Sequence, residues 1–194
     1  MSLRTPRAFG LAAVVMAGGR STRMGQDKAL MIWRGKSLIS RQIEVLRTIQ
    51  PDELLISGRS KEHYGEPDVP VVMDRKKGRG PLAGLCAAFA ATKASHLLVL
   101  AVDMPNVNTA FLNELLSLCR PGTGVIPRLG SNFEPLLAVY PRRSYARAQS
   151  HLSDEHLKMQ NFAEDAVADN ELAVFEVAGP NELCFRNLNS PEDI

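Results

Sequence analysis

The sequence lacks an excess of charge of either sign. Its 194 residues carry 23 Lys and Arg against 21 Asp and Glu, which gives a formal net charge of +2 at pH 7. Proteins that bind nucleic acid through many phosphate contacts usually carry a clear basic excess, so we expect no nucleic-acid partner. The chain also lacks internal repeats and low-complexity runs, which excludes the solenoid, fibrous and disordered classes.

A long hydrophobic segment is also missing. No stretch approaches the roughly 20 apolar residues that span a bilayer, so we expect no membrane association. Residues 8–17 are apolar and follow Arg4 and Arg7, as in a secretory signal. These residues are followed directly by a glycine pair at 18–19 and a polar stretch. This is typical of a buried strand that ends at a loop, and it argues against a secretory signal. We therefore expect a cytoplasmic protein.

Cysteine is scarce, with three residues, Cys86, Cys119 and Cys184, and no Cys-x-x-Cys pair. An odd number at wide spacing argues against a disulfide framework and against a structural zinc site. We expect buried free thiols in a reducing compartment. The histidines His151 and His156 lie five residues apart, so they do not form a His-Glu-x-x-His metal motif.

Short apolar runs alternate with stretches of helical period, which is the pattern of βαβ units around a parallel sheet. The expected class is α/β with a mostly parallel central sheet. Expected strands are 11–16, 54–57, 69–73, 97–101, 124–127, 135–140, 172–177 and 183–186. Expected helices are 38–49 with Ser37 as cap, 82–92, 109–118 with Thr109 as cap, 142–152 and 162–168.

The strand at 97–101 is apolar throughout, which favours a central place in the sheet. No linker or run of charge divides the chain, so we expect a single domain over residues 1–194. Within it, residues 11–120 are expected to bind a nucleotide and residues 121–194 to bind the acceptor.

Ligands of open parallel sheets bind beyond the carboxyl ends of the strands. The first polar segment at such a place runs from residue 16 to residue 28. Gly18 and Gly19 let the backbone approach a phosphate closely, while Arg23 and Lys28 supply the positive charge that a triphosphate needs. The segment is not Gly-x-Gly-x-x-Gly, so the dinucleotide fingerprint is excluded. An ordinary loop with solvated charges is the structural alternative.

A nearby segment, Gly35-Lys36-Ser37, has the last residues of a P-loop. The first glycine of that motif is replaced by Leu30, and the segment does not directly follow the first strand. We expect instead a turn at Gly35, a solvated Lys36 and a helix cap at Ser37.

The second polar segment is glycine-rich and covers residues 78–84, at the start of a helix. Free N–H groups at a helix start favour an anion or the polar edge of a base. Asp74 precedes it, and a basic cluster at 75–79 crowds the same loop. This cluster has two equal interpretations, namely contact with phosphate or substrate, and a solvated face.

The third place is Asp103, directly after the expected central strand. A carboxylate there must be paired or must bind a cation, because an unpaired buried charge is costly. Mg²⁺ beside a nucleotide fits, since this ion takes one or two carboxylates together with phosphate oxygens and water. A helix cap or a salt bridge to an arginine is the structural alternative.

Together these segments resemble the molybdenum cofactor guanylyltransferases. Two departures from the family pattern are expected, Met16 in place of the usual Leu and a C-terminal helix that is only a stub at Ile194. The resemblance covers roughly residues 11–194 and is weakest over 142–181. The motifs that carry it are Met16-Ala17-Gly18-Gly19, Arg23-Met24-Gly25, Asp27-Lys28, Gly80-Pro81-Leu82-Ala83-Gly84, Asp103-Met104-Pro105, Glu134-Pro135-Leu136 and Asn187-Leu188-Asn189-Ser190-Pro191-Glu192.

The resemblance implies a three-layer Rossmann-like nucleotidyltransferase fold. It also implies transfer of GMP from GTP to the terminal phosphate of molybdopterin, with or without bound molybdenum, and release of pyrophosphate. Arg23, Lys28 and Asp103 are then the catalytic residues, with Mg²⁺ on Asp103 and the two cations on the triphosphate. Transient contact with molybdoenzymes or cofactor chaperones follows from the same likeness.

The same likeness places the guanine, the ribose and the acceptor. Asn187 and Asn189 are expected to face the acceptor. The expected nucleotide-binding residues are Met16, Ala17, Gly18, Gly19, Lys28, Ser57, Gly58, Asp74, Gly80, Pro81, Leu82, Gly84 and Asp103.

Other functions stay open at this point. The nearest is a sister enzyme that uses CTP on molybdopterin or on another small acceptor, although Gly18-Gly19 favours guanine on family grounds because cytidylyl relatives more often carry Ala-Gly. A sugar-1-phosphate nucleotidyltransferase, a non-catalytic nucleotide-binding or adaptor subunit, and a P-loop GTPase are the remaining alternatives.

Overall fold

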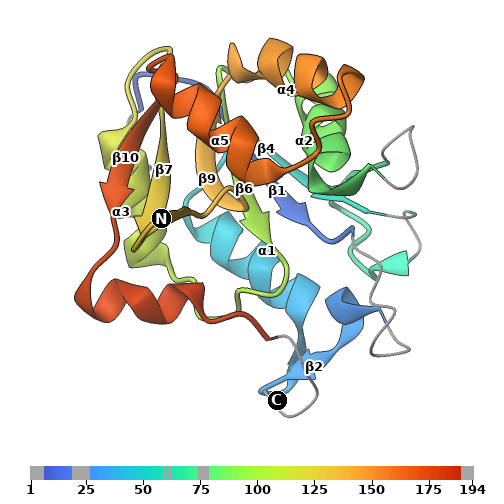
Figure 1. The fold of residues 1–194 in the computed structure, drawn as a ribbon. Coiled ribbons are helices and arrows are strands. Elements are labelled where there is room, and N and C mark those ends of the chain that lie inside the picture. Colours follow the sequence, from blue (N-terminus) through green and yellow to red (C-terminus); the bar gives the residue numbers. More distant parts are fainter. Residues whose placement is uncertain (1–6, 19–26, 59, 61–62, 74–78, 189–194) are drawn as a thin grey trace.

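A mixed β-sheet of eight strands forms the centre of the protein (Figure 1). The computed structural model describes residues 7–18, 27–58, 60, 63–73 and 79–188. Seven strands follow one another across the sheet in the order β10 (Leu172–Glu176), β7 (Gly124–Leu129), β9 (Leu137–Pro141), β6 (His96–Ala101), β1 (Leu11–Met16), β4 (Glu53–Ser57) and β5 (Val71–Val72). The eighth, β8 (Asn132–Phe133), pairs with β7.

Most neighbouring strands are parallel, as the sequence predicts. β1 pairs in parallel with both β4 and β6, β4 pairs in parallel with β5, and β7 pairs in parallel with β10. The exceptions are β9, which runs antiparallel to β6 and β7, and β8, which runs antiparallel to β7. The apolar strand β6 lies in the middle of the order, which confirms its predicted central place.

Helices cover both faces of the sheet and give three layers (Figure 1). Helices α1 (Leu38–Thr48) and α3 (Thr109–Leu118) lie on one face, and α2 (Gly80–Ala91), α4 (Ser144–Ser153) and α5 (Met159–Ala168) lie on the other. Alternate residues of β1 point into two separate cores, Ala13 and Val15 into one, Val14 and Met16 into the other. Both faces are covered, so β1 and β6 are buried at every position and read as continuous apolar runs.

A short hairpin precedes α1 and accounts for the P-loop-like segment. β2 (Ile32–Trp33) and β3 (Lys36–Ser37) pair antiparallel around Arg34 and Gly35, whose φ angles are 49° and 81°. Two positive φ values in a two-residue loop are those of a type I′ turn. The Ser37 hydroxyl accepts a hydrogen bond from the Ser40 N–H, and the exposed Lys36 pairs with Glu44. The predicted turn, solvated lysine and helix cap are confirmed.

The structure differs from expectation at residues 183–186 and at the cap of α3. Residues 183–186 do not form a strand, because they lie in and just after the 3₁₀ helix η3 (Gly179–Phe185). That segment begins with Gly179 at a φ of 62° and Pro180, which favour tight turns, and its Phe185 ring packs against Phe111. Helix α3 is capped by Asn108 and not by Thr109, since the Asn108 side chain accepts from the Phe111 N–H at 3.0 Å.

The three cysteines are free and buried, as predicted. Burial raises the pKa of the Cys86 thiol to about 11 and that of Cys119 to about 12, so both are inert thiols at neutral pH. Among the described residues, no helix combines the length and the apolar character needed to cross a membrane.

Gly124 provides a test of the sheet packing. A Cβ atom at this position would lie 1.9 Å from the carbonyl oxygen of Val139 on the neighbouring strand. We expect Gly124→Ala to lower the free energy of unfolding by about 1–3 kcal/mol, because backbone must move to admit the methyl group. Urea denaturation measures this. Gly10→Ala is the control, since its Cβ would meet nothing closer than 3.7 Å, and equal losses in the two variants would contradict the packing argument.

Candidate active site

The strand register places several predicted site residues in one row. Met16, the last residue of β1, lies opposite Ser57 on β4 and opposite Ala101 on β6. The next residue, Ala17, donates its N–H to the Ser57 carbonyl at 2.9 Å. Asp103 follows two residues after Ala101. The carboxyl ends of β1, β4 and β6 therefore meet at one edge of the sheet, where ligands of such folds bind.

The described part of the glycine loop ends at Gly18. Met16 and Ala17 are buried, whereas Gly18 is exposed. A Cβ at Gly18 would meet nothing closer than 3.8 Å within the described residues, so packing there does not require a glycine. Gly19 and Arg23 lie outside the described residues, and their predicted roles stay predictions.

Two other predicted glycines are explained by close packing. A Cβ at Gly84 would lie 2.5 Å from the Ser57 hydroxyl oxygen, so this glycine lets α2 approach β4. A Cβ at Gly58 would lie 2.3 Å from the Tyr64 hydroxyl oxygen. Both residues shape the site without needing to touch a ligand.

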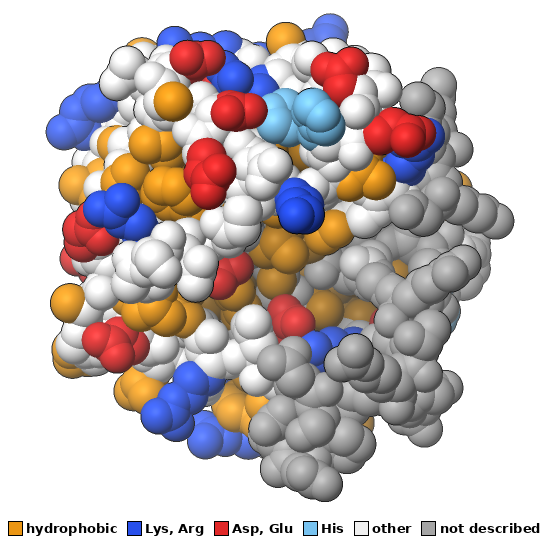
Figure 2. All heavy atoms as spheres, in the orientation of Figure 1, with side chains coloured by type: hydrophobic (Ala, Val, Ile, Leu, Met, Phe, Trp, Pro, Cys, Tyr) orange, Lys and Arg blue, Asp and Glu red, His pale blue; other side chains and the backbone are white. Residues whose placement is uncertain are grey.

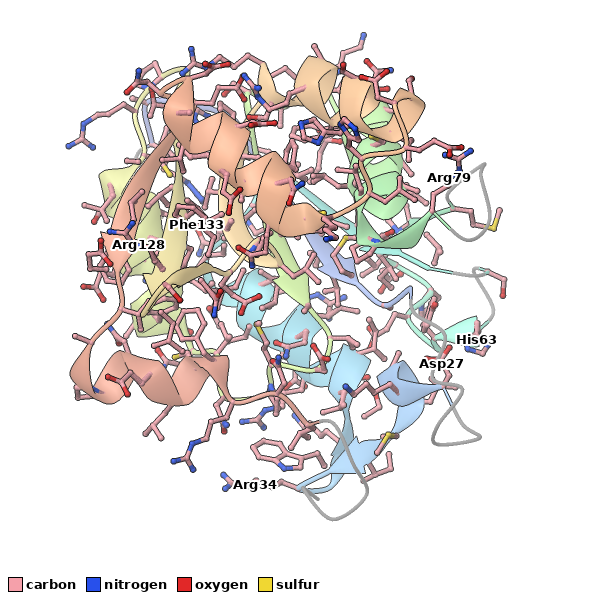
Figure 3. All side chains as sticks on the ribbon, viewed as in Figure 1. Asp27, Arg34, His63, Arg79, Arg128 and Phe133 are labelled. Carbon is pink, nitrogen blue, oxygen red and sulfur yellow. The ribbon has the colours of Figure 1, made fainter. Side chains whose placement is uncertain are left out.

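The start of α2 lies next to the same edge, because Gly84 in its first turns packs against β4. Gly80 is exposed with a φ of 67°, and Pro81 follows in the first turn. The Leu82 side chain is fully buried, so only its backbone can face a ligand. Asp74 and residues 75–78 lie outside the described part of the chain. Arg79, the described member of the basic cluster, pairs with Glu155 at 3.0 Å (Figure 3).

Lys28 and Asp103 form an ion pair at this edge. Lys28 lies on the 3₁₀ helix η1 (Lys28–Leu30), and its Nζ is 2.8 Å from Oδ2 of Asp103. The two side chains are 18% and 26% exposed, so water still reaches both. The partner of Asp103 is thus a lysine and not the arginine of the structural alternative. Two residues 75 positions apart, both predicted to be catalytic, are brought together.

Hydrogen bonds to the backbone on both sides hold the Asp103 turn. The Val102 N–H donates to Met16, and Gln42 on α1 donates from Nε2 to the Met104 carbonyl at 2.8 Å. Gln42 is only 1% exposed, and sequence reasoning missed it. The sequence does contain a sign of this role, because Gln42 is a polar residue on the apolar face of α1, between Ile39 and Leu46.

The C-terminal segment reaches the same turn. The N–H of Leu188 donates to the Asp103 carbonyl at 3.0 Å, which places the exposed Asn187 directly beside this contact. Asn189 lies outside the described residues. One of the two predicted acceptor-binding residues therefore lies next to the backbone of Asp103.

Glu134 is a further acidic group at the site, and sequence reasoning assigned it no role. Burial and the negative charge of Asp103 raise the pKa of Glu134 to about 7, although the Leu136 N–H opposes this by donating to the carboxylate. The motif Glu134-Pro135-Leu136 was expected to belong mainly to a strand, but β9 begins at Leu137 and the motif forms the turn before it.

The backbone around Glu134 is held by side chains on both sides. Gln160 of α5 both donates to the Phe133 carbonyl and accepts from the Phe133 N–H. The buried Tyr140 hydroxyl donates to the Pro135 carbonyl at 2.8 Å. These contacts fix the Glu134 turn, so the carboxyl group has a defined place.

The donor set at this edge fits a divalent cation. Glu134 and Asp103 are close enough for one charge to raise the pKa of the other, and carboxylate oxygens are the ligands that Mg²⁺ prefers. No group of three or more His, Cys, Asp or Glu that could hold a metal occurs among the described residues. A metal ion held by these two carboxylates would take its remaining ligands from phosphate oxygens and water.

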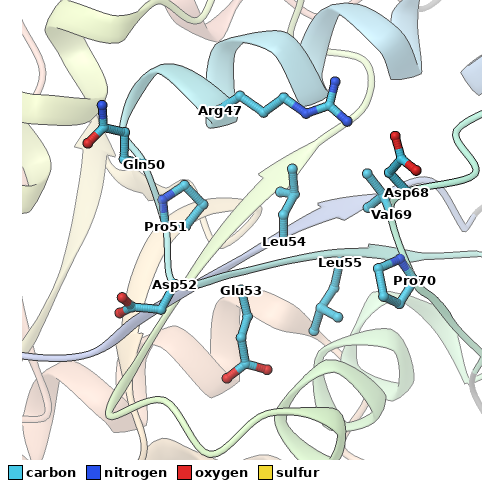
Figure 4. Close-up of a pocket in the computed structure, with 10 residues that line it drawn as sticks. All are labelled: Arg47, Gln50, Pro51, Asp52, Glu53, Leu54, Leu55, Asp68, Val69 and Pro70. Atoms are coloured by element: carbon cyan, nitrogen blue, oxygen red, sulfur yellow. The ribbon is translucent and has the colours of Figure 1, made fainter. Parts of the chain in front are cut away.

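A groove of about 530 Å³ lies elsewhere (Figure 4). It includes residues 51–55, at and just before the amino end of β4, whereas Ser57 is at the carboxyl end of the same strand. The groove is therefore separate from the ion pair. On the visible face of the molecule, acidic and basic side chains are interspersed, as the near-zero net charge suggests (Figure 2).

Comparison with known proteins adds sequence relatives. The chain matches the MobA-like NTP transferase domain over residues 13–168. It is 40% identical over 191 residues to the "Probable molybdenum cofactor guanylyltransferase" of Opitutus terrae, covering 96% of this chain and 94% of the relative. It is 32% identical over 188 residues to the molybdenum cofactor guanylyltransferase of Pseudomonas aeruginosa, covering 92% and 90%.

Solved structures share the fold. Molybdopterin-guanine dinucleotide biosynthesis protein A from Archaeoglobus fulgidus superposes with a TM-score of 0.74 at 23% identity, covering 94% of both chains. The 2-C-methyl-D-erythritol 4-phosphate cytidylyltransferase of Thermus thermophilus superposes with a TM-score of 0.65 at 15% identity, covering 93% of both. The predicted three-layer nucleotidyltransferase fold is confirmed, and the chain belongs to the MobA-like NTP transferase family.

Proposed function

We propose that the protein transfers GMP from GTP to the terminal phosphate of molybdopterin and releases pyrophosphate. The single observation that carries the proposal is the Lys28–Asp103 pair at the joined carboxyl ends of β1, β4 and β6. The names of the relatives from Opitutus terrae and Pseudomonas aeruginosa support the same reaction. The new bond joins an acceptor phosphate oxygen to the α-phosphorus, and the bond to the β-phosphate bridging oxygen breaks.

Phosphoryl-type transfer depends mainly on alignment and on neutralising charge, so no protein nucleophile is needed. Lys28 offers an ammonium group to the triphosphate, and we assign Arg23 to the same task by family likeness. Asp103 would hold the divalent metal ion that enzymes of this family generally use, which we propose is Mg²⁺. When bound, the ion neutralises phosphate charge. With Asp103 engaged in holding the ion, the Lys28 ammonium would be available to phosphate oxygens.

The guanine is proposed to lie against the backbone of residues 16–19 and 80–84. Ser57 and Gly58, which end β4 at the same edge, would then lie near the base and ribose together with Asp74. Asn187 and Asn189 would face the acceptor. In this scheme one domain has two halves, residues 11–120 for the nucleotide and residues 121–194 for the acceptor, which the Leu188–Asp103 hydrogen bond supports.

We further propose a cytoplasmic location, where GTP is supplied, and transient contact with molybdoenzymes or cofactor chaperones that receive the product. The second candidate function is cytidylyl transfer to molybdopterin or another small acceptor. One observation favours keeping it, because the structurally similar Thermus thermophilus protein is named a cytidylyltransferase.

The choice of nucleotide is directly testable. Incubation of the protein with molybdopterin, Mg²⁺ and each nucleoside triphosphate should yield the guanine dinucleotide and pyrophosphate with GTP, and little product with CTP. Mass spectrometry of the dinucleotide measures the outcome, and equimolar GTP and CTP give the preference in one reaction. Preferred formation of the cytosine dinucleotide would replace the proposal by its alternative.

Asp103 is the residue on which the proposed reaction depends most. We expect Asp103→Asn to lower kcat/KM for pyrophosphate release by about 10²–10³-fold, because the carboxylate that would hold the metal ion is lost. Lys36→Ala is the matched control, since this exposed lysine pairs with Glu44 instead. Unchanged circular dichroism should accompany the loss. Full activity of Asp103→Asn would overturn the assignment, and loss of GTP binding in Lys36→Ala would favour a P-loop.

The charge near Asp103 also predicts how stability depends on pH. The folded-state pKa of Glu134, about 7, exceeds the 4.5 of an ordinary glutamate, so the folded protein holds more protons between these values. The contribution of the Glu134 carboxyl group to the free energy of unfolding is therefore lost as pH rises from about 4.5 to 7. Without metal or nucleotide, Glu134→Gln should be more stable than the parent above pH 7, by on the order of 3 kcal/mol at most.

Urea denaturation at pH 5 and pH 8 measures this difference. Glu164→Gln, on the exposed face of α5, is the control and should shift neither value. If the difference in unfolding free energy between Glu134→Gln and the parent is the same at both pH values, the surroundings do not raise the pKa of the Glu134 carboxyl group.

A further inference from the structure

Asp27, which precedes Lys28, is held from two directions (Figure 3). Its side chain is 7% exposed, and each carboxylate oxygen has a separate partner. Oδ1 accepts the N–H of Ala29 at 3.0 Å and so caps the short helix η1 that carries Lys28. Oδ2 lies 2.6 Å from Nε2 of His63. The backbone conformation at Lys28 therefore depends on where the Asp27 carboxylate is held.

His63 comes from a different part of the chain, after β4. Its ring packs edge to face on Tyr64, with ring centroids 4.9 Å apart. Tyr64 is 3% exposed and fills the space that a side chain at Gly58 would need. His63 is thus tied to the Ser57–Gly58 turn, on the nucleotide side of the proposed site, whereas Asp27 is tied to the lysine proposed to meet the triphosphate.

A lysine has four rotatable side-chain bonds, so the place of its ammonium group depends strongly on where its backbone is fixed. Lys28 reaches Asp103 at 2.8 Å from a three-residue helix that the Asp27 side chain caps. The contacts from His63 to Asp27, from Asp27 to η1 and from Lys28 to Asp103 form one continuous series. It joins the turn after β4 to the turn after β6.

We propose that His63 is a positioning residue for the transfer reaction, which acts through Asp27 to hold Lys28 in line with the nucleotide turn at Ser57–Gly58. The expected effect of His63 on turnover rests on the proposed function. Its expected effect on the position of Lys28 does not. A neutral imidazole donates Nε2–H to the carboxylate, and the amide of a glutamine can supply the same donor. The hydrogen bond, and not the charge of His63, is the property that the proposal requires.

The first test measures the environment of Lys28 without any substrate. Brief acetylation followed by peptide mass spectrometry gives the labelling rate of Lys28 relative to Lys36, which is exposed and serves as internal reference. His63→Leu should raise this ratio about threefold or more, since a lysine released from its ion pair is more accessible. His63→Gln should keep the ratio near that of the parent. An unchanged ratio in His63→Leu would overturn the proposal.

The second test measures catalysis with GTP, molybdopterin and Mg²⁺. We expect His63→Leu to lower kcat about tenfold with a smaller change in KM for GTP, and His63→Gln to restore most of the activity. His156→Leu removes an exposed imidazole elsewhere and should change neither value. A loss of urea stability without a loss of kcat in His63→Leu would show a structural role only, and would also overturn the proposal.

A double-mutant cycle connects the two residues. If His63 acts through Asp27, the kcat loss of Asp27→Asn combined with His63→Leu should be smaller than the two single losses added as free energies. Additive losses would count against the series of contacts. If the parent protein shows no guanylyl transfer while the labelling ratio still rises in His63→Leu, the proposed function fails and the positioning of Lys28 by His63 stands.

Discussion

Parallel pairing of β1 with β4 on one side and β6 on the other decides where the polar groups of the site lie. The register aligns the last residues of the three strands, Met16, Ser57 and Ala101, in one row. After each of these residues, the backbone leaves the sheet at the same level. A shift of one strand by a single residue would reverse which side chains face each core, so the hydrophobic alternation of β1 also maintains the geometry of the edge.

Support for this edge comes from the interior of the protein. Gln42 donates to the turn after β6 from within the apolar face of α1, and the Tyr140 hydroxyl donates to the Glu134 turn from within the opposite core. Buried polar groups are costly unless they are hydrogen-bonded, and here each is bonded to a backbone carbonyl beside the site. The two cores therefore hold the loops as well as the sheet.

The parts of the fold that sequence reasoning predicted are those with a strong local signal. The buried strands β1 and β6 are long apolar runs, and the capping of α1 by Ser37 follows from residue type and position. The errors occurred where the signal is short or comes from distant packing. The strands of the hairpin β2–β3, which were not predicted, have two residues each, and the 3₁₀ helix η3 packs its Phe185 ring on Phe111 of α3, far away in the sequence.

The site shows the same division. Lys28 and Asp103 were predicted because their residue types and their places after strands point to phosphate and metal chemistry. Glu134 was given no role, because it precedes the strand β9, whereas the ligand-binding residues of open parallel sheets are expected after strands. Neither Gln42 nor His63 follows a strand directly, and each takes its place from contacts more than 30 residues away in the sequence. Such contacts cannot be inferred from spacing alone.

The reversed direction of β9 has a consequence for how such a protein can change. Because β9 runs antiparallel to β6, its first residue and not its last lies at the ligand edge. The Glu134 turn thus enters the site from a hairpin that is separate from the loops after β1, β4 and β6. One backbone hydrogen bond, from the Ala101 N–H to the Leu136 carbonyl at 2.7 Å, joins this turn to the end of β6. The turn thus brings side chains to the site from outside the loops that the parallel strands supply, and these side chains can change during evolution while the backbone contact is kept.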